Sequence, residues 1–139
     1  MRNIRWFYCC FLVALMACKN NKTAVPVEQS EGKMLYDKYC LICHQQNGSG
    51  VPGMYPPLQR SDWINGDKSR LIGIMLNGLT GEIKVNDQVY KTAMPSHQYL
   101  NDEQIAGVLT YIRSNFGNQA GAISPAEVTA LRNSNPAPQ

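Results

Sequence analysis

The sequence is poor in histidine, in net charge and in long apolar segments, and each shortage excludes a class of function. Only two of its 139 residues are histidines, so a metal centre built from several imidazoles is excluded. The formal net charge is +3, and two of the 13 basic residues, Arg2 and Arg5, precede the first apolar run. The other 11 basic residues face 10 acidic ones, which gives no electrostatic case for nucleic-acid binding.

After Arg5, the 11 residues from Trp6 to Met16 are all apolar. This is roughly half the length that a transmembrane helix needs, but it suits the apolar region of a secretory signal. The following Leu15-Met16-Ala17-Cys18 resembles the lipobox of bacterial lipoproteins. We therefore predict that residues 1–17 are a lipoprotein signal peptide and that Cys18 carries the lipid. An ordinary signal peptide with an incidental Cys18 is the alternative.

The cysteine pattern supports an exported, lipid-anchored protein. Two of the five cysteines leave with such a signal, and Cys40 and Cys43 form a pair. Cys18 then remains as a lone thiol in an oxidising compartment, where bonding to a lipid would remove it. We predict a location on the periplasmic side of a bacterial membrane.

The rest of the chain divides into a tether, one domain and a tail. Residues 18–27 are polar and then proline-containing, which is typical of a flexible linker. Residues 28–123 are predicted to form the domain, which is marginal in size for a core of side chains alone. Residues 124–139 are predicted to be a tail that begins with a short helix near Ser124-Pro125 and ends in a disordered segment.

Apolar periodicity predicts an all-α domain with three main helices and a small β-hairpin. The helices are expected from about Glu28 to Cys40, from Asp67 to Gly78, and from Asn101 to Gly117. Asn101 and Gln104 have the spacing of a capping box. The hairpin is predicted to pair residues 83–85 with residues 88–90 around an Asn-Asp turn.

Cys40-Leu41-Ile42-Cys43-His44 is the attachment motif of a c-type haem. Two cysteines one helical turn apart can bond both vinyl groups of one macrocycle, and the adjacent histidine can coordinate the iron. The motif could instead be a thioredoxin-like pair, half of a zinc site or a local disulfide. The first needs a strand–helix–strand context and the second needs more ligands, and neither is found; a disulfide does not explain His44.

The second axial ligand must come from elsewhere in the chain. We predict Met94, because it lies in a loop stiffened by Pro95 just before the last main helix. His97 is the alternative ligand, although we interpret it as an exposed loop residue near the haem edge. The other candidates are weaker because of their positions in the chain: Met34, Met54 and Met75, the last of which is expected to pack in the core.

Gly48-Ser49-Gly50-Val51-Pro52-Gly53 has the spacing of a dinucleotide-binding loop. That loop functions only between a strand and the N-terminus of a helix, and this segment follows the haem motif and leads into prolines. We therefore predict no nucleotide binding. The glycines are expected to let the backbone turn tightly against the macrocycle.

These residues together resemble the class I, mitochondrial-type cytochromes c, over about Gly32 to Phe116. The resemblance is closest to short bacterial c-type domains that accept electrons from quinoprotein dehydrogenases, or that are fused to copper nitrite reductases and oxidase subunits. It implies one covalent haem c with His44 and Met94 as axial ligands.

The resemblance also implies roles for residues around the haem. Tyr55-Pro56-Pro57-Leu58 is similar to the family's proline loop, in which a proline carbonyl accepts a hydrogen bond from the haem-ligating histidine; either Pro56 or Pro57 could do so. Gly32 with Tyr36, and Gly107 with Tyr111, resemble the family's crossing of the first and last helices. Three residues are candidates for contacts with the haem propionates, with ordinary packing as the alternative: Arg60, Ser61 and Trp63.

The implied function is single-electron transfer between exported or membrane redox proteins, without catalysis on a substrate. The partners would be a dehydrogenase, a reductase or an oxidase. One alternative is a subunit bound permanently to such an enzyme. Another is a ligand sensor or peroxidase in which Met94 leaves the iron.

Overall fold

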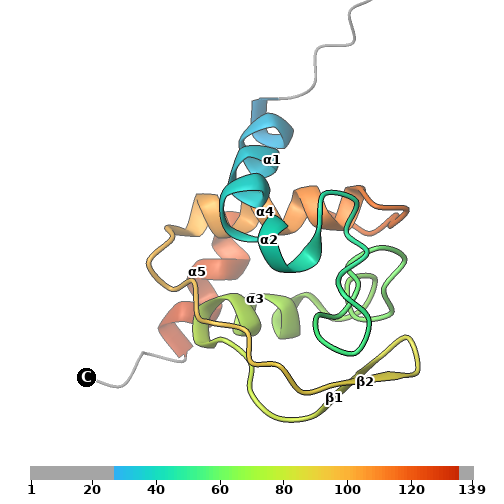
Figure 1. The fold of residues 1–139 in the computed structure, drawn as a ribbon. Coiled ribbons are helices and arrows are strands. Elements are labelled where there is room, and N and C mark those ends of the chain that lie inside the picture. The colour runs from blue at the N-terminus through green and yellow to red at the C-terminus, as the bar shows by residue number, and fades with distance from the viewer. Residues whose placement is uncertain (1–26, 135–139) are drawn as a thin grey trace, which may run out of the picture.

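A computed structural model describes residues 27–134, with side chains from Ser30 onward. The predicted signal peptide, Cys18 and most of the predicted tether lie outside this range. None of the helices within it has the length and apolarity that a membrane crossing requires. The elements, shown in Figure 1, are α1 (Val27–Tyr39), α2 (Leu41–His44), α3 (Lys68–Asn77), β1 (Ile83–Val85), β2 (Gln88–Tyr90), α4 (Asp102–Ser114) and α5 (Pro125–Ser134).

The predicted helices and hairpin are confirmed, and α1, α3 and α4 are the three main helices. Asp67 caps α3 by accepting a hydrogen bond from the Ser69 backbone N–H at 2.9 Å. Asn101 and Gln104 form the complete capping box of α4. The apolar stripe of α4 is buried, as its periodicity predicts: Ile105, Val108, Leu109 and Ile112.

The predicted end of α4 at Gly117 is wrong, because the helix ends at Ser114. Asn115 already has extended backbone, and Phe116 is left-handed with φ of 55°. This turn directs the Phe116 ring back toward Tyr36, with ring centroids 5.0 Å apart. Phe116 thus joins the apolar core from beyond the helix rather than from its stripe.

The hairpin has the predicted register, with Ile83 opposite Tyr90 and Val85 opposite Gln88. Asn86 and Asp87 both have positive φ, which is the backbone of a type I′ turn. The hairpin is antiparallel and packs one face inward, since Val85 and Tyr90 are buried.

Residues 124–134 pack against the domain, although they were expected to belong to a tail. The predicted short helix extends as α5 to Ser134, and it contacts both α3 and α4. Val128 on its inner face is fully buried, and Glu127 pairs with Lys68 of α3 at 2.9 Å. The apolar face of α5 docks this helix on the domain, so the packed part of the chain extends to Ser134.

The α1–α4 crossing is the most extensive helix contact, and it depends on one glycine. A Cβ on Gly32 would lie 2.4 Å from the Gly107 carbonyl oxygen and 2.8 Å from the Tyr111 Cβ. A Cβ on Gly107 would meet nothing within 4 Å. Of the two glycines implied at this crossing, only Gly32 is required by the close approach of the helices.

We predict that Gly32→Ala lowers the free energy of unfolding of the haem-loaded protein by about 1–3 kcal/mol, as overpacking of a core does. Gly107→Ala is the matched control, and it should be neutral or stabilising by up to about 1 kcal/mol because alanine favours a helix interior. Denaturant titration of both variants measures the difference. Equal losses of stability would contradict the prediction.

We predict that Glu127 makes α5 docking sensitive to acid. The Ser124 backbone N–H and then Lys68 lower the pKa of Glu127 to about 2 from an ordinary 4.5. A carboxylate with a lowered pKa stabilises the fold fully above its unfolded pKa, and this stabilisation decreases as the pH falls from about 4.5 toward 2. Glu127→Gln should therefore be less stable than the wild type at pH 7. Denaturant titrations should show this gap narrowing at pH 3, whereas a gap of constant size would refute the assignment.

Candidate haem site

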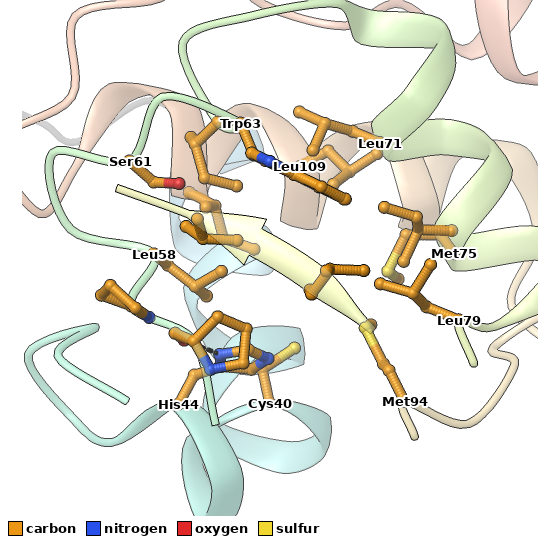
Figure 2. Close-up of a pocket in the computed structure, with 17 residues that line it drawn as sticks. Cys40, His44, Leu58, Ser61, Trp63, Leu71, Met75, Leu79, Met94 and Leu109 are labelled. Atoms are coloured by element: carbon orange, nitrogen blue, oxygen red, sulfur yellow. Dashed lines mark hydrogen bonds between the residues drawn. The ribbon is translucent and has the colours of Figure 1, made fainter. Parts of the chain in front are cut away.

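A cavity lies between α2, the loop at residues 56–64, α3, the hairpin and α4. Apolar walls with a few polar groups directed inward are typical of sites that hold a cofactor or a small molecule. Figure 2 shows its lining side chains, which are mostly aliphatic. Examples from the helices are Leu71, Ile74, Met75, Leu109 and Ile112.

His44 reaches this cavity from the end of α2, and its side chain has one nitrogen already engaged. Its Nδ1 lies 3.0 Å from the carbonyl oxygen of Pro56. Because a carbonyl oxygen can only accept, Nδ1 carries the proton and Nε2 has the free lone pair. Burial lowers the pKa of His44, and the Pro56 hydrogen bond opposes this only partly. The structure therefore presents a neutral, oriented imidazole. Pro56 makes this contact, while Pro57 lines the cavity beside it.

Gly50 brings Pro56 back to His44. Its backbone has φ of 64°, and its N–H donates to the His44 carbonyl at 3.0 Å. A Cβ here would lie 2.3 Å from the Tyr55 carbonyl oxygen and 2.6 Å from that of Pro56. Only glycine permits this turn, which explains Gly50, the second glycine of the segment that resembles a nucleotide-binding motif.

The glycine-rich segment lacks the context of a dinucleotide site, since α2 precedes it and the next helix begins only at Lys68. We expected these glycines to turn against the macrocycle. The nearest protein neighbours of Gly48 are atoms of the Phe116 ring, and those of Gly50 belong to the loop itself. The turn against the macrocycle stays a prediction.

The two cysteines flank the turn that carries His44. Cys40 precedes α2, lies buried and lines the cavity, while Cys43 lies within α2 and is half-buried. Neither forms a disulfide within the described residues. Burial, and to a lesser extent the neighbouring Cys43, raise the pKa of the Cys40 thiol to about 12. The unmodified thiol is therefore a buried, uncharged group that faces the cavity.

Met94 lies across the cavity from His44 and Cys40 (Figure 2). Its backbone N–H and carbonyl both bond to Leu79 at 2.9 Å. Gly78 allows this approach, because a Cβ there would lie 2.7 Å from the Met94 carbonyl oxygen. The methionine is thus held at the cavity wall by its own backbone.

The other candidate ligands are placed differently. Met75 is buried on α3 and also lines the cavity, whereas Met34 and Met54 are 62% and 49% exposed and do not. His97 was expected to be exposed, and this is wrong because its side chain is only 7% exposed. It packs beside Tyr39, and its Nδ1 lies 2.9 Å from the Tyr99 hydroxyl. His97 does not line the cavity.

The three candidates for propionate contacts are also placed differently relative to the cavity. The Ser61 Oγ is buried in the cavity wall, and among the described buried side-chain polar atoms it alone has no hydrogen-bond partner. Trp63 lines the cavity, but its Nε1 already donates to the Lys84 carbonyl at 2.8 Å. Arg60 is exposed and does not line the cavity.

The cavity fits a haem by the chemistry of its donors. It combines aliphatic walls, a free imidazole nitrogen, a thioether on the opposite side and a buried hydroxyl without a partner. Among residues 27–134 no three histidine, cysteine or acidic side chains gather to hold a metal ion directly. This arrangement suits an iron porphyrin and does not suit a protein-ligated zinc ion.

Sequence reasoning missed two polar residues that hold the loops around the cavity. Asn118 is buried, and its Nδ2 donates to the Leu58 carbonyl at 2.8 Å while its Oδ1 accepts from the Ser61 N–H at 3.3 Å. Arg113 is also buried and donates to the Ile64 carbonyl at 2.7 Å. Arg113 follows Leu109 by one helical turn, so its position on the inner face of α4 could have been predicted.

Comparison with known proteins identifies a family for most of the described residues. Residues 29–116 match the family Cytochrome c. The chain is 39% identical over 94 residues to cytochrome c-552 of Thermus thermophilus. The matched region covers 65% of this chain and 71% of that protein. It is 33% identical over 123 residues to the cytochrome c subunit of alcohol dehydrogenase (quinone) from Gluconacetobacter polyoxogenes.

The match to the dehydrogenase subunit covers 86% of this chain but only 25% of that subunit. The cbb3-type cytochrome c oxidase subunit CcoP of Azospirillum brasilense is 34% identical over 68 residues, 45% of this chain and 23% of that subunit. The chain therefore spans about a quarter of these larger subunits. The family match alone covers most of the described residues, and this chain belongs to the cytochrome c family.

Proposed function

We propose that this chain is a single-electron carrier that binds one haem c, with His44 and Met94 as the axial ligands. The observation that carries the proposal is the pair of groups facing one apolar cavity. On one side is the imidazole of His44, whose Nδ1 is held by Pro56. On the other side is Met94, whose backbone is held by Leu79.

Each residue around the cavity has a distinct part in holding the cofactor. Cys40 and Cys43 would bond the two vinyl groups, so the macrocycle could not diffuse away. The Ser61 hydroxyl is the buried polar group best suited to a propionate, while Trp63 forms part of the wall. Haem bound in this way supplies an iron that gains or loses one electron.

The surroundings of the cavity favour the reduced state. A thioether ligand raises the potential relative to two nitrogen ligands. The aliphatic walls solvate the additional charge of oxidised iron poorly, which has the same effect. Because both axial positions are filled, we infer no open site for a substrate and no enzymatic activity of the chain itself.

The second candidate function is a permanently bound electron-transfer subunit. The similarity to cytochrome subunits of a dehydrogenase and an oxidase supports it. In either case the partners are redox proteins. We further propose that the protein is exported and lipid-anchored through Cys18, with redox partners at the same membrane surface. Copurification with a large enzyme under mild detergent would favour the subunit over a free carrier.

We predict that Met94→Ala keeps the covalent haem but opens the iron to external ligands and lowers the reduction potential. Losing the internal ligand should raise imidazole affinity by at least about tenfold, which is roughly 1.4 kcal/mol. Met54→Ala is the control, because Met54 is exposed and away from the cavity. Absorption spectra, carbon monoxide binding to the reduced protein and redox titration report the change. An unchanged Met94→Ala spectrum would assign the ligand to another residue.

We predict that Cys18→Ser moves the full-length protein from the membrane to the soluble exported fraction. Acyl chains contribute about 0.8 kcal/mol per buried methylene, so removing them should abolish the anchoring. Fractionation of cells that express each form, followed by haem staining, measures the distribution. Retention of the serine variant in the membrane would rule out lipidation of Cys18 as the anchor.

A further inference from the structure

Helix α5 lies beyond the 29–116 family match, yet it contacts the segment that leads from Met94 into α4. In Figure 1 this segment runs from the hairpin past α5 to the start of α4. Val128 anchors α5 in the core, and Leu131 packs against the same cluster. The polar side of the helix is then placed against residues 98–102.

The part of the segment nearest Met94 is held by α3 and the residues just after it. Besides the bond pair between Met94 and Leu79, the Ser96 hydroxyl donates to the Leu76 carbonyl at 2.6 Å. The His97 backbone N–H donates to the Met75 carbonyl at 2.8 Å. These contacts fix one end of the segment.

Arg132 of α5 holds the other end with all three of its side-chain nitrogens. Its Nη1 donates to the Gln98 carbonyl at 2.9 Å, and its Nη2 donates to the Leu100 carbonyl at 2.8 Å. Its Nε donates to Asp102, the first residue of α4, at 2.8 Å. The Arg132 side chain is only 32% exposed, so these charge-assisted bonds are partly shielded from water.

A planar guanidinium suits this role better than an ammonium does. It can donate in three fixed directions at once, and here these directions meet two carbonyls and one carboxylate. Thr129 donates to the same Asp102 carboxylate, which orients it toward Arg132. The geometry therefore joins α5, the start of α4 and the segment after Met94.

We propose that Arg132 is a positioning residue that keeps Met94 at the cavity wall by fixing residues 98–100. This inference rests on the proposed function, because it needs Met94 to be the axial ligand. Arg132 does not line the cavity and acts only through the segment. Without it, residues 98–102 lose three hydrogen bonds to α5, and Met94 can yield its place to an external ligand more readily.

The test is the affinity of imidazole for the oxidised, haem-loaded full-length protein at pH 7. Arg132→Ala should raise this affinity about tenfold, because it removes hydrogen bonds from a charged donor. Arg132→Lys should raise it less, roughly threefold, since an ammonium keeps the ion pair with Asp102 but cannot reach both carbonyls. If the alanine variant does not fold, the imidazole affinity of the lysine variant tests the proposal on its own.

Lys68→Ala is the matched control. It removes the ion pair between α3 and α5 without touching residues 98–102. It should therefore change imidazole affinity by less than about twofold, as expected for an exposed pair. A larger increase would mean that docking of α5 as a whole, rather than Arg132, controls the ligand, and would overturn the proposal.

A double-mutant cycle distinguishes this inference from the proposed function. In the Met94→Ala background, Arg132→Ala should add no further affinity for imidazole. Both substitutions act by weakening the same bond, the one between Met94 and the iron. An equal increase in both backgrounds would overturn the positioning role alone. If Arg132→Ala lowers stability but leaves imidazole affinity unchanged, the role is merely structural and the inference fails. If Met94→Ala has no effect on affinity, the ligand assignment fails and the inference fails with it.

Discussion

The hydrogen bond from His44 Nδ1 to the Pro56 carbonyl is the interaction on which the site depends. It sets the tautomer of a buried imidazole, fixes the ring orientation and leaves Nε2 as the only nitrogen available for a metal. The bond joins residues twelve positions apart, so it needs a loop that reverses tightly. Gly50 provides that reversal at a position where any Cβ would overlap the Tyr55 and Pro56 carbonyls.

The wall that carries Met94 is held by backbone hydrogen bonds rather than by a side chain. Met94 is held by two backbone hydrogen bonds to Leu79, next to another glycine that permits close approach. The two walls belong to separate parts of the chain, and aliphatic side chains from α3 and α4 line the cavity between them. A covalently held macrocycle would pack against these aliphatic side chains, which suits a domain too small to be stabilised easily by side chains alone.

The sequence predicted those features that have local causes. Neighbouring residues determine the capping box at Asn101, the Asn-Asp hairpin turn and the helical turn that places His44 next to the cysteine pair. It failed where distant contacts decide the outcome. Only the folded loop shows that Pro56 rather than Pro57 meets His44, and only packing beside Tyr39 explains why His97 is buried. Similarly, the docking of α5 depends on an acceptor surface formed by α3 and α4, which no local pattern describes.

The segments around the cavity are irregular, so many of their carbonyls have no partner in a helix or sheet, and buried carbonyls require one. Long polar side chains from the C-terminal part of the chain meet this need. Arg113 and Asn118 donate to carbonyls within residues 58–66, and Arg132 donates to carbonyls of residues 98–100. Burial lowers the pKa of Arg113, because apolar surroundings disfavour its charged form. By donating to these carbonyls, the three side chains stabilise the loop conformations that surround the cavity. These three residues therefore fix loops that form the haem cavity, although none of the three lines it.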